Sequence, residues 1–202
     1  MSAPTRLGVL LSGRGSNFLA IHEAIRRGEL TAEIACVVSN RADARGLEIA
    51  RELGIPAHLA DHRGRSREEH EQAVRDILEQ HRVGLVCLAG YMRRLTAHFV
   101  AAYPLRIVNV HPSLLPAFIG VDAQQQAVDH GVKITGCTVH FVTEELDGGP
   151  ILVQRSIAVL PHDTGESLAA RLLPEEHRAY VEALKIICEG GYRVEGRRVL
   201  PV

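Results

Sequence analysis

An apolar run leads directly into a glycine-rich turn in LGVLLSGRGSNFLAI, residues 7–21. Apolar runs of the same continuous kind recur at 33–39, 83–89 and 106–110. A strand that is apolar at every position is typical of a parallel sheet with both faces covered, whereas a half-exposed strand alternates. These four runs therefore predict buried parallel strands.

Helical patterns separate these runs, at residues 16–27, 43–53 and 66–81. Ser66 begins the last of them and two glutamates follow in the first turn, which is typical of a capped helix start. Strand alternating with helix predicts an α/β fold, with helices flanking a mostly parallel, Rossmann-like sheet.

The pattern changes after residue 110. A proline-containing loop, a short helix, two strand candidates and a long helix are expected at 111–121, 122–129, 133–142, 150–159 and 164–188. Both strands alternate polar and apolar residues, so we expect antiparallel strands that are exposed on one face. Pro174 lies inside the long helix and is expected to bend or split it. A hairpin of Tyr192–Val194 and Arg198–Leu200 closes the chain.

The composition is that of one ordinary globular domain. With 202 residues, 46% of them hydrophobic and 23% charged, the chain can bury a core, and we expect a single domain over 1–202. The formal net charge of −1 provides no positive field to hold a phosphodiester backbone, so nucleic acid is not expected as a partner. The apolar runs are far shorter than the ~20 residues of a membrane span, so no membrane contact is expected.

Four cysteines lie widely spaced in apolar stretches, and they are Cys36, Cys87, Cys137 and Cys188. Without a CxxC pair they are interpreted as reduced core thiols, which favours a reducing cytoplasm. The amino terminus has no pattern of a targeting segment. The histidines are scattered, with no HExxH motif or Cys/His cluster, so no metal site is expected.

The turn after the first strand, SGRGSN at 12–17, has the chemistry of a phosphate site. Its glycines let the backbone approach an anion, and the helix that follows presents free N–H groups. A dinucleotide fingerprint would need glycine in place of Phe18 and an acidic residue in place of Ser39 or Asn40. The loop therefore favours a monophosphate, although the same turn is also an ordinary way to join strand to helix.

Two further segments place polar residues at strand ends, NVHPSLLP at 109–116 and HFVTEELDGGP at 140–150. Asn109 and His111 are two residues apart in an extended backbone and project to one face, as an oxyanion-binding pair requires. Asp147 could face the same cleft and take part in proton transfer. Taken singly, Asp147 also fits an ordinary turn residue and His111 a capped loop histidine.

Together, these segments resemble the phosphoribosylglycinamide formyltransferases of purine biosynthesis. The matching stretches are LLSGRGSNFLAI at 10–21, LAGYMRRL at 88–95, NVHPSLLPAF at 109–118 and GCTVHFVTEELDGGPI at 136–151. The resemblance implies the formyltransferase fold and transfer of a formyl group from 10-formyltetrahydrofolate to the amine of glycinamide ribonucleotide. It also implies a cytoplasmic monomer or homodimer that needs no metal.

The resemblance implies a role for each matching residue. Asn109 and a protonated His111 hold the oxyanion, and Asp147 keeps the imidazole charged and relays the amine proton. The ribonucleotide is bound by Gly13, Arg14, Gly15, Ser16, Asn17 and Glu176. The folate is bound by Arg67, Met92, Arg93, Arg94, Leu95, Asn109, His140, Val142 and Glu144. Residues 1–110 then form a phosphate-binding half and 111–202 a folate and catalytic half.

The sequence departs from the family at Ile119-Gly120-Val121-Asp122, where members commonly have Pro-Gly-Leu-His, and at Pro174 and Val181. Formyl-folate hydrolases and methionyl-tRNA formyltransferases share the Asn, His and Asp arrangement, but they carry an additional domain that we do not expect in 202 residues. A non-catalytic nucleotide-binding module on the same scaffold is a further alternative, and it predicts tolerance of substitution at all three residues.

Overall fold

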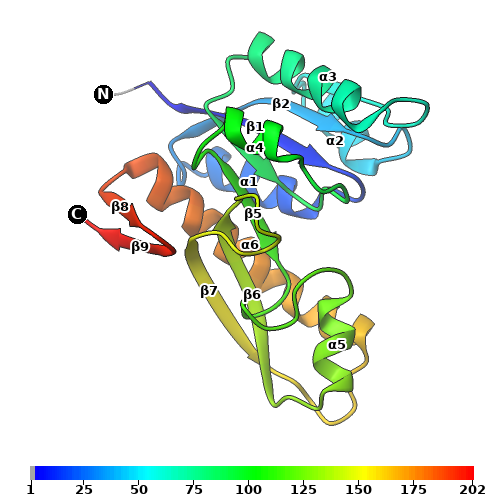
Figure 1. Ribbon diagram of the computed structural model, residues 1–202, viewed down its shortest axis with the longest axis vertical. Helices are drawn as coiled ribbons and strands as arrows, with labels where there is room; N and C mark the ends of the chain where they lie inside the picture. Colours follow the sequence, from blue (N-terminus) through cyan, green and yellow to red (C-terminus); the bar gives the residue numbers. More distant parts are fainter. Residues whose placement is uncertain (1–2) are drawn as a thin grey trace. The chain divides into compact units, whose positions relative to one another are not determined.

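The computed structural model describes residues 3–202 (Figure 1). It divides into two compact units, the first ending at Val108 and the second comprising Asn109–Val202. The sequence suggested a division after residue 110. The organisation as one domain stays a prediction.

The first unit is built on a parallel sheet. Its strands are β1 (Thr5–Leu11), β2 (Ala32–Ser39), β3 (Ala57–Leu59), β4 (Leu85–Leu88) and the start of β5 (Ile107–His111), in the order β3-β2-β1-β4-β5. The pairings of β1 with β2 and β4, and of β2 with β3, are all parallel. The side chains of Leu7, Val9, Leu10 and Leu11 are fully buried, so the prediction of buried parallel strands is confirmed.

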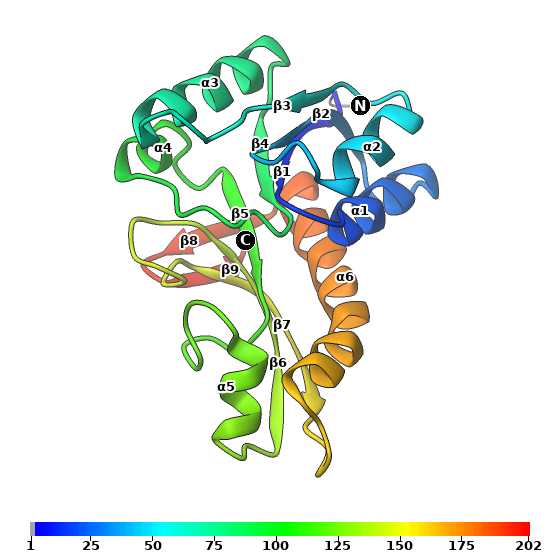
Figure 2. The same cartoon turned by 90° about the vertical axis from the view of Figure 1, so that its right-hand side faces the viewer.

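The helices of the first unit are α1 (Ser16–Arg26), α2 (Arg45–Glu52), α3 (Arg67–Gln80) and α4 (Ala97–Ala102). The chain moves one way along the sheet from β1 to β3 and then returns to β4 on the other side of β1. Because parallel crossovers are right-handed, the reversal puts α3 on the opposite face from α1 and α2. Figure 2 shows α1 and α2 on one side of these strands and α3 and α4 on the other.

Two elements of the first unit were not predicted. The strand β3 has only three residues, too few for a hydrophobic pattern to reveal it. The helix α4 has six residues and depends on contacts outside itself: Thr96 Oγ1 accepts from Phe99 N, and the buried Glu71 accepts from Thr96 N and Oγ1. The predicted start of α3 is confirmed, because Ser66 and Glu69 form a reciprocal capping box.

The second unit contains the end of β5, β6 (Ile134–Phe141), β7 (Ile151–Ala158), β8 (Tyr192–Glu195) and β9 (Arg198–Pro201), in the order β5-β6-β7-β9-β8. β6 pairs with β7, and β8 with β9, in antiparallel fashion. The predicted antiparallel strands and terminal hairpin are therefore confirmed. The helices of this unit are α5 (Ala123–Asp129) and α6 (Gly165–Glu189).

The expected exposure of one face holds for β7, whose residues alternate, but is wrong for β6, which is buried from Thr135 to Phe141. α6 packs on β6, and the loop after β5 also bonds to this strand. Thr138 Oγ1 donates to Ser113 O and accepts from Leu115 N. Because a helix and a loop both contact β6, its polar positions are buried as well.

The helix α6 runs without a break through Pro174, so the expected split is wrong. Thr164 and Ser167 cap its start reciprocally. Leu168 and Leu172 are fully buried before the proline and Tyr180 after it. Burial of apolar side chains on both sides outweighs the roughly 3 kcal/mol that proline costs in a helix interior.

The four cysteines are free thiols, three of them buried and Cys188 half-buried. Burial raises the pKa of the Cys36 and Cys137 thiols to about 12. These side chains are therefore protonated at neutral pH and serve as small apolar groups of the core, as the sequence predicted.

Candidate active site

Asn109 and His111 lie on β5 in the second unit. The period of two along a strand places both side chains on one side of the backbone. His111 is buried and Asn109 is half-buried. A donor pair at the carboxyl end of a strand thus stands where the sequence placed it.

Asp147 belongs to the loop between β6 and β7, and its backbone has φ of 50°, in the left-handed region. Asp tolerates this conformation better than most residues, and such strain is concentrated at functional sites. A Cβ on Gly149 would lie 1.8 Å from Phe141 O, so only glycine allows the loop to turn back this closely. The loop therefore fixes where the Asp147 carboxylate lies.

The carboxylate of Asp147 points into the protein, with its side chain only 10% exposed. Its Oδ2 lies 3.5 Å from His111 Nδ1, and its Oδ1 lies 3.9 Å from His140 Nε2. Asn109 Nδ2 lies 3.3 Å from the same His140 Nε2. The structure thus brings Asn109, His111 and Asp147 into one cluster, with His140 as a fourth member.

His140 orients Asn109. Its Nδ1 lies 2.9 Å from Phe141 O, and because a carbonyl only accepts, Nδ1 carries the proton and Nε2 is an acceptor for Asn109 Nδ2. Burial lowers the pKa of His140, against the opposing effects of the Phe141 carbonyl and Asp147. A neutral His140 therefore engages one amide N–H of Asn109 and leaves the other for a ligand.

The sequence connected His140 with folate binding and not with this cluster. A register shift between Val139 and His140 opposite β7 sets where the side chain lies. Hydrophobic patterning carries no signal of such a bulge.

His111 faces an acceptor at each ring nitrogen. Its Nε2 lies 2.8 Å from Phe118 O and therefore donates to it, while Nδ1 faces Asp147. The segment 118–122 that supplies this carbonyl carries φ of 53°, 85° and 55° at Phe118, Gly120 and Asp122. The residues that depart from the family pattern thus lie in a strained loop that contacts the cluster.

The glycine-rich loop of the first unit ends in Gly15, the N-cap of α1, with φ of 80° and no side-chain cap bond among the described residues. The first turn of α1 contains no acidic residue, so its N–H groups suit an anion. A Cβ on Gly15 would lie 2.8 Å from Gly46 Cα, and Gly46 N donates to Gly13 O. Gly13 and Arg14 are exposed, Ser16 is half-buried, and Gly15 and Asn17 are buried.

The residues expected to bind folate are divided between the two units. In the first unit Met92 is 77% exposed, Arg93 and Leu95 are half-buried, and Arg94 and Arg67 are exposed. In the second unit Val142 is half-buried and Glu144 exposed. Exposed apolar side chains such as Met92 are what a binding surface for a flat heterocycle offers.

Glu176 lies half-buried on α6. Burial is the main cause of the raised pKa of Cys137, and the charge of Glu176 adds to it. Glu176 therefore lies near β6 in the second unit.

Among residues 3–202, no group of three or more His, Cys, Asp and Glu side chains could hold a metal ion, and no helix could span a membrane. An open hollow of about 910 Å³ lies along α3 and the start of α4, lined among others by Arg65, Glu68 and His98. None of the predicted site residues lines it, and its mixture of charges favours no single ligand. Each unit offers a better candidate. In the second unit Asn109, His111, His140 and Asp147 form one cluster, and in the first unit the start of α1 has no acidic residue in its first turn.

Comparison with known proteins identifies the family of the chain. Residues 5–184 match the formyl transferase family. A relative that is called phosphoribosylglycinamide formyltransferase, from Haemophilus influenzae, is 39% identical over 94% of this chain and 90% of its own length. The chain belongs to the phosphoribosylglycinamide formyltransferase family. It is therefore a formyltransferase.

Other relatives of the formyltransferase support the assignment. The crystal structure of glycinamide ribonucleotide transformylase 1 from Symbiobacterium toebii superposes with a TM-score of 0.97 at 48% identity, over 100% of this chain and 96% of that one. The trifunctional purine biosynthetic protein adenosine-3 of Gallus gallus is 43% identical over 94% of this chain. The formyltransferase spans only 19% of the length of that larger protein.

Proposed function

We propose that this formyltransferase moves the formyl group of 10-formyltetrahydrofolate onto the amine of glycinamide ribonucleotide, a step of purine biosynthesis. The observation that carries the proposal is the cluster of Asn109, His111 and Asp147, with His111 held between two acceptors. The family membership and the relatives of the same name support the choice of substrates.

The first step is attack of the neutral amine on the formyl carbon, which makes the formyl oxygen an oxyanion. His111 Nε2 donates to Phe118 O at 2.8 Å. In the reaction the oxyanion would take the place of this carbonyl as the acceptor. The free amide N–H of Asn109 supplies a second donor. Two fixed donors stabilise charge that develops only in the transition state, and each is worth about 10²–10³ in rate.

The second step is proton transfer from the attacking amine to the leaving folate nitrogen. Asp147 Oδ2 lies 3.5 Å from His111 Nδ1, so the carboxylate stands beside the ring that holds the oxyanion. The same carboxylate takes the amine proton and passes it on through water. The C–N bond to the folate then breaks and the tetrahedral centre collapses to the new formamide.

Binding of the two substrates follows from the remaining residues. The loop at 13–17 receives the phosphate at the start of α1, and Glu176 contacts the glycinamide amine. Arg67, Met92, Arg93, Arg94 and Leu95, with Asn109, His140, Val142 and Glu144, bind the folate. We further propose that the protein is cytoplasmic, which its free thiols support. We also propose that it is a monomer or homodimer and needs no metal.

The test is incubation with 10-formyltetrahydrofolate, with and without glycinamide ribonucleotide, following tetrahydrofolate release. We expect release only when the ribonucleotide is present, together with formation of the formylated amine. Release without an acceptor would instead identify a hydrolase. Absence of turnover, with both ligands bound, would identify a non-catalytic module.

A further inference from the structure

Ser12 connects the loop at 13–17 with the segment that leads into Met92. Its main-chain N donates to Gly90 O at 3.0 Å, and its Oγ accepts from Met92 N at 2.8 Å. Ser12 is 5% exposed, so water does not compete for these bonds. One residue thus links the proposed phosphate loop to the proposed folate segment, all within the first unit.

Asn40 determines which way the Ser12 hydroxyl points. Ser12 Oγ donates to Asn40 Oδ1 at 2.6 Å, and Asn40 is 4% exposed. A hydroxyl has a single proton and two lone pairs. With the proton committed to Asn40, a lone pair remains for Met92 N–H.

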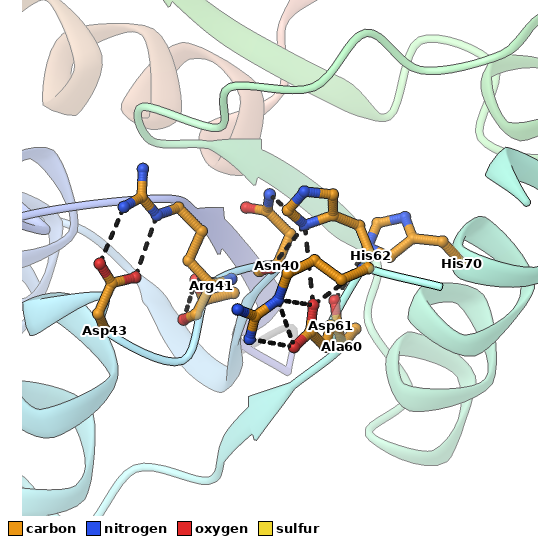
Figure 3. A network of polar contacts seen from close by, with 9 residues as sticks. Asn40, Arg41, Asp43, Ala60, Asp61, His62 and His70 are labelled. Carbon is orange, nitrogen blue, oxygen red and sulfur yellow. Dashed lines mark hydrogen bonds and ion pairs between the residues drawn. The ribbon is translucent and has the colours of Figure 1, made fainter. Parts of the chain in front are cut away.

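Asn40 is itself held in place at the end of β2. His62 Nδ1 lies 2.9 Å from Asn40 O and donates to it, and it lies 3.3 Å from Asn40 Nδ2. His62 Nδ1 also lies 4.0 Å from Asp61 Oδ1, and Asp61 pairs with Arg63. Figure 3 shows the side chain of Asn40 next to His62, with Asp61 beside them.

We infer that Asn40 is a positioning residue for the formyl-transfer reaction, which fixes Met92 relative to the phosphate loop through the Ser12 hydroxyl. This inference rests on the proposed function. Asn40 touches neither substrate. It acts by holding the loop at 13–17 and the segment that leads into Met92 in a fixed relative position. Binding of the ribonucleotide and binding of the folate are therefore energetically coupled.

The test is a double-mutant cycle between Asn40 and Ser12, measured as the KM for 10-formyltetrahydrofolate at saturating glycinamide ribonucleotide. Asn40→Leu keeps the size and removes the acceptor, and we expect the KM to rise about 3- to 10-fold, the range for one lost hydrogen bond. Ser12→Ala should give a similar rise. The double variant should be no worse than either single one, because both remove the same contact.

Two variants separate positioning from a merely structural role. Asn40→Asp keeps an oxygen acceptor for Ser12 and should restore the KM to within about twofold of the starting protein. Ser39→Ala is the matched control, because within residues 3–202 the Ser39 hydroxyl bonds only to the main chain of Arg41. It should leave the KM unchanged. Unfolding curves of every variant accompany the kinetics.

Additive effects of Asn40→Leu and Ser12→Ala, or failure of Asn40→Asp to rescue, would overturn the inference. If Asn40→Leu does not fold, the KM values of Asn40→Asp and Ser12→Ala still test the inference. Failure of the proposed function is seen separately, as absence of formyl transfer by the unsubstituted protein.

Discussion

Gly120 N donates to Asp147 Oδ2 at 3.0 Å. The same oxygen faces His111 Nδ1, so the main chain of the loop helps to aim the carboxylate at the imidazole. Gly120 lies between Ile119 and Val121, two of the residues that depart from the family pattern. The departure therefore changes the side chains of the loop but keeps the glycine whose N–H is used.

The first prediction concerns Gly120 itself. Gly120→Ala should lower kcat about tenfold, because the strain of φ 85°, about 1–2 kcal/mol, displaces the N–H from Asp147. Gly131→Ala is the matched control, with φ of 66° and, like Gly120, nothing within 4 Å of an added Cβ. Steady-state kinetics and unfolding curves should show similar destabilisation but loss of turnover only at Gly120. Equal turnover in both variants would contradict the assigned role.

Asp147→Asn should lower kcat about 10²–10³-fold, because an amide cannot accept the amine proton. Glu145→Gln in the same loop is the control, since Glu145 is exposed and, within residues 3–202, its carboxylate pairs only with the exposed Arg197. A surface ion pair contributes little, so its kcat should not change. Turnover of Asp147→Asn within a factor of a few would favour the non-catalytic module.

Gly15→Ala should raise the KM for glycinamide ribonucleotide about tenfold, the effect of losing one hydrogen bond to a charged group. The added Cβ would lie 2.8 Å from Gly46 Cα and would push the loop away from α2. Gly28→Ala shares a positive φ, 70°, but has open space around the Cβ. The KM should stay unchanged in this control, and a shared rise would assign the effect to strain in general.

The free energy of unfolding should fall as the pH drops below about 6.5. Burial lowers the pKa of His58, His70, His140 and His177 from their ordinary value of 6.5. Below that value the unfolded chain takes up protons that the folded chain does not, so stability is fully present above pH 6.5 and is lost toward the lower folded pKa values.

Urea unfolding between about pH 7.5 and 5.5 measures this loss. His177→Leu removes one of the four groups, whose pKa is lowered by burial alone, and should make the dependence shallower. An unchanged slope would show that His177 is protonated in the folded state as readily as in the unfolded one.

Pro174→Ala should raise the free energy of unfolding by about 1–3 kcal/mol, because alanine restores a main-chain N–H and removes the ring from the middle of α6. Thermal unfolding measures the change. Pro174 is exposed, so no core packing is lost. A lower melting temperature would mean that the ring makes a stabilising contact that its exposure does not reveal.

Much of the fold follows from local sequence. The runs that became β1, β2 and β4 are apolar at nearly every position, and the starts of α3 and α6 carry capping residues. Elements that depend on distant partners escaped prediction, as α4 did because it relies on Glu71. The continuity of α6 through Pro174 likewise depends on burial of apolar side chains on both sides of the proline, which no local pattern reveals.

The site was predictable to the extent that strand ends collect polar residues. Asn109 and His111 follow from the period of two along β5, and Asp147 from the resemblance to the family. The fourth member, His140, depends on a register shift, and the role of Asn40 depends on a hydroxyl that lies 28 positions away in sequence. Contacts of this kind arise only when the sheet is assembled.

The burial of the thiols has a practical consequence. A thiol whose pKa is about 12, like those of Cys36 and Cys137, reacts slowly with maleimides because the thiolate is the nucleophile. Among the four cysteines only Cys188 is half-buried. Replacing Cys188 alone should therefore leave a chain in which a single new surface cysteine can be labelled with a fluorophore, without rebuilding the core.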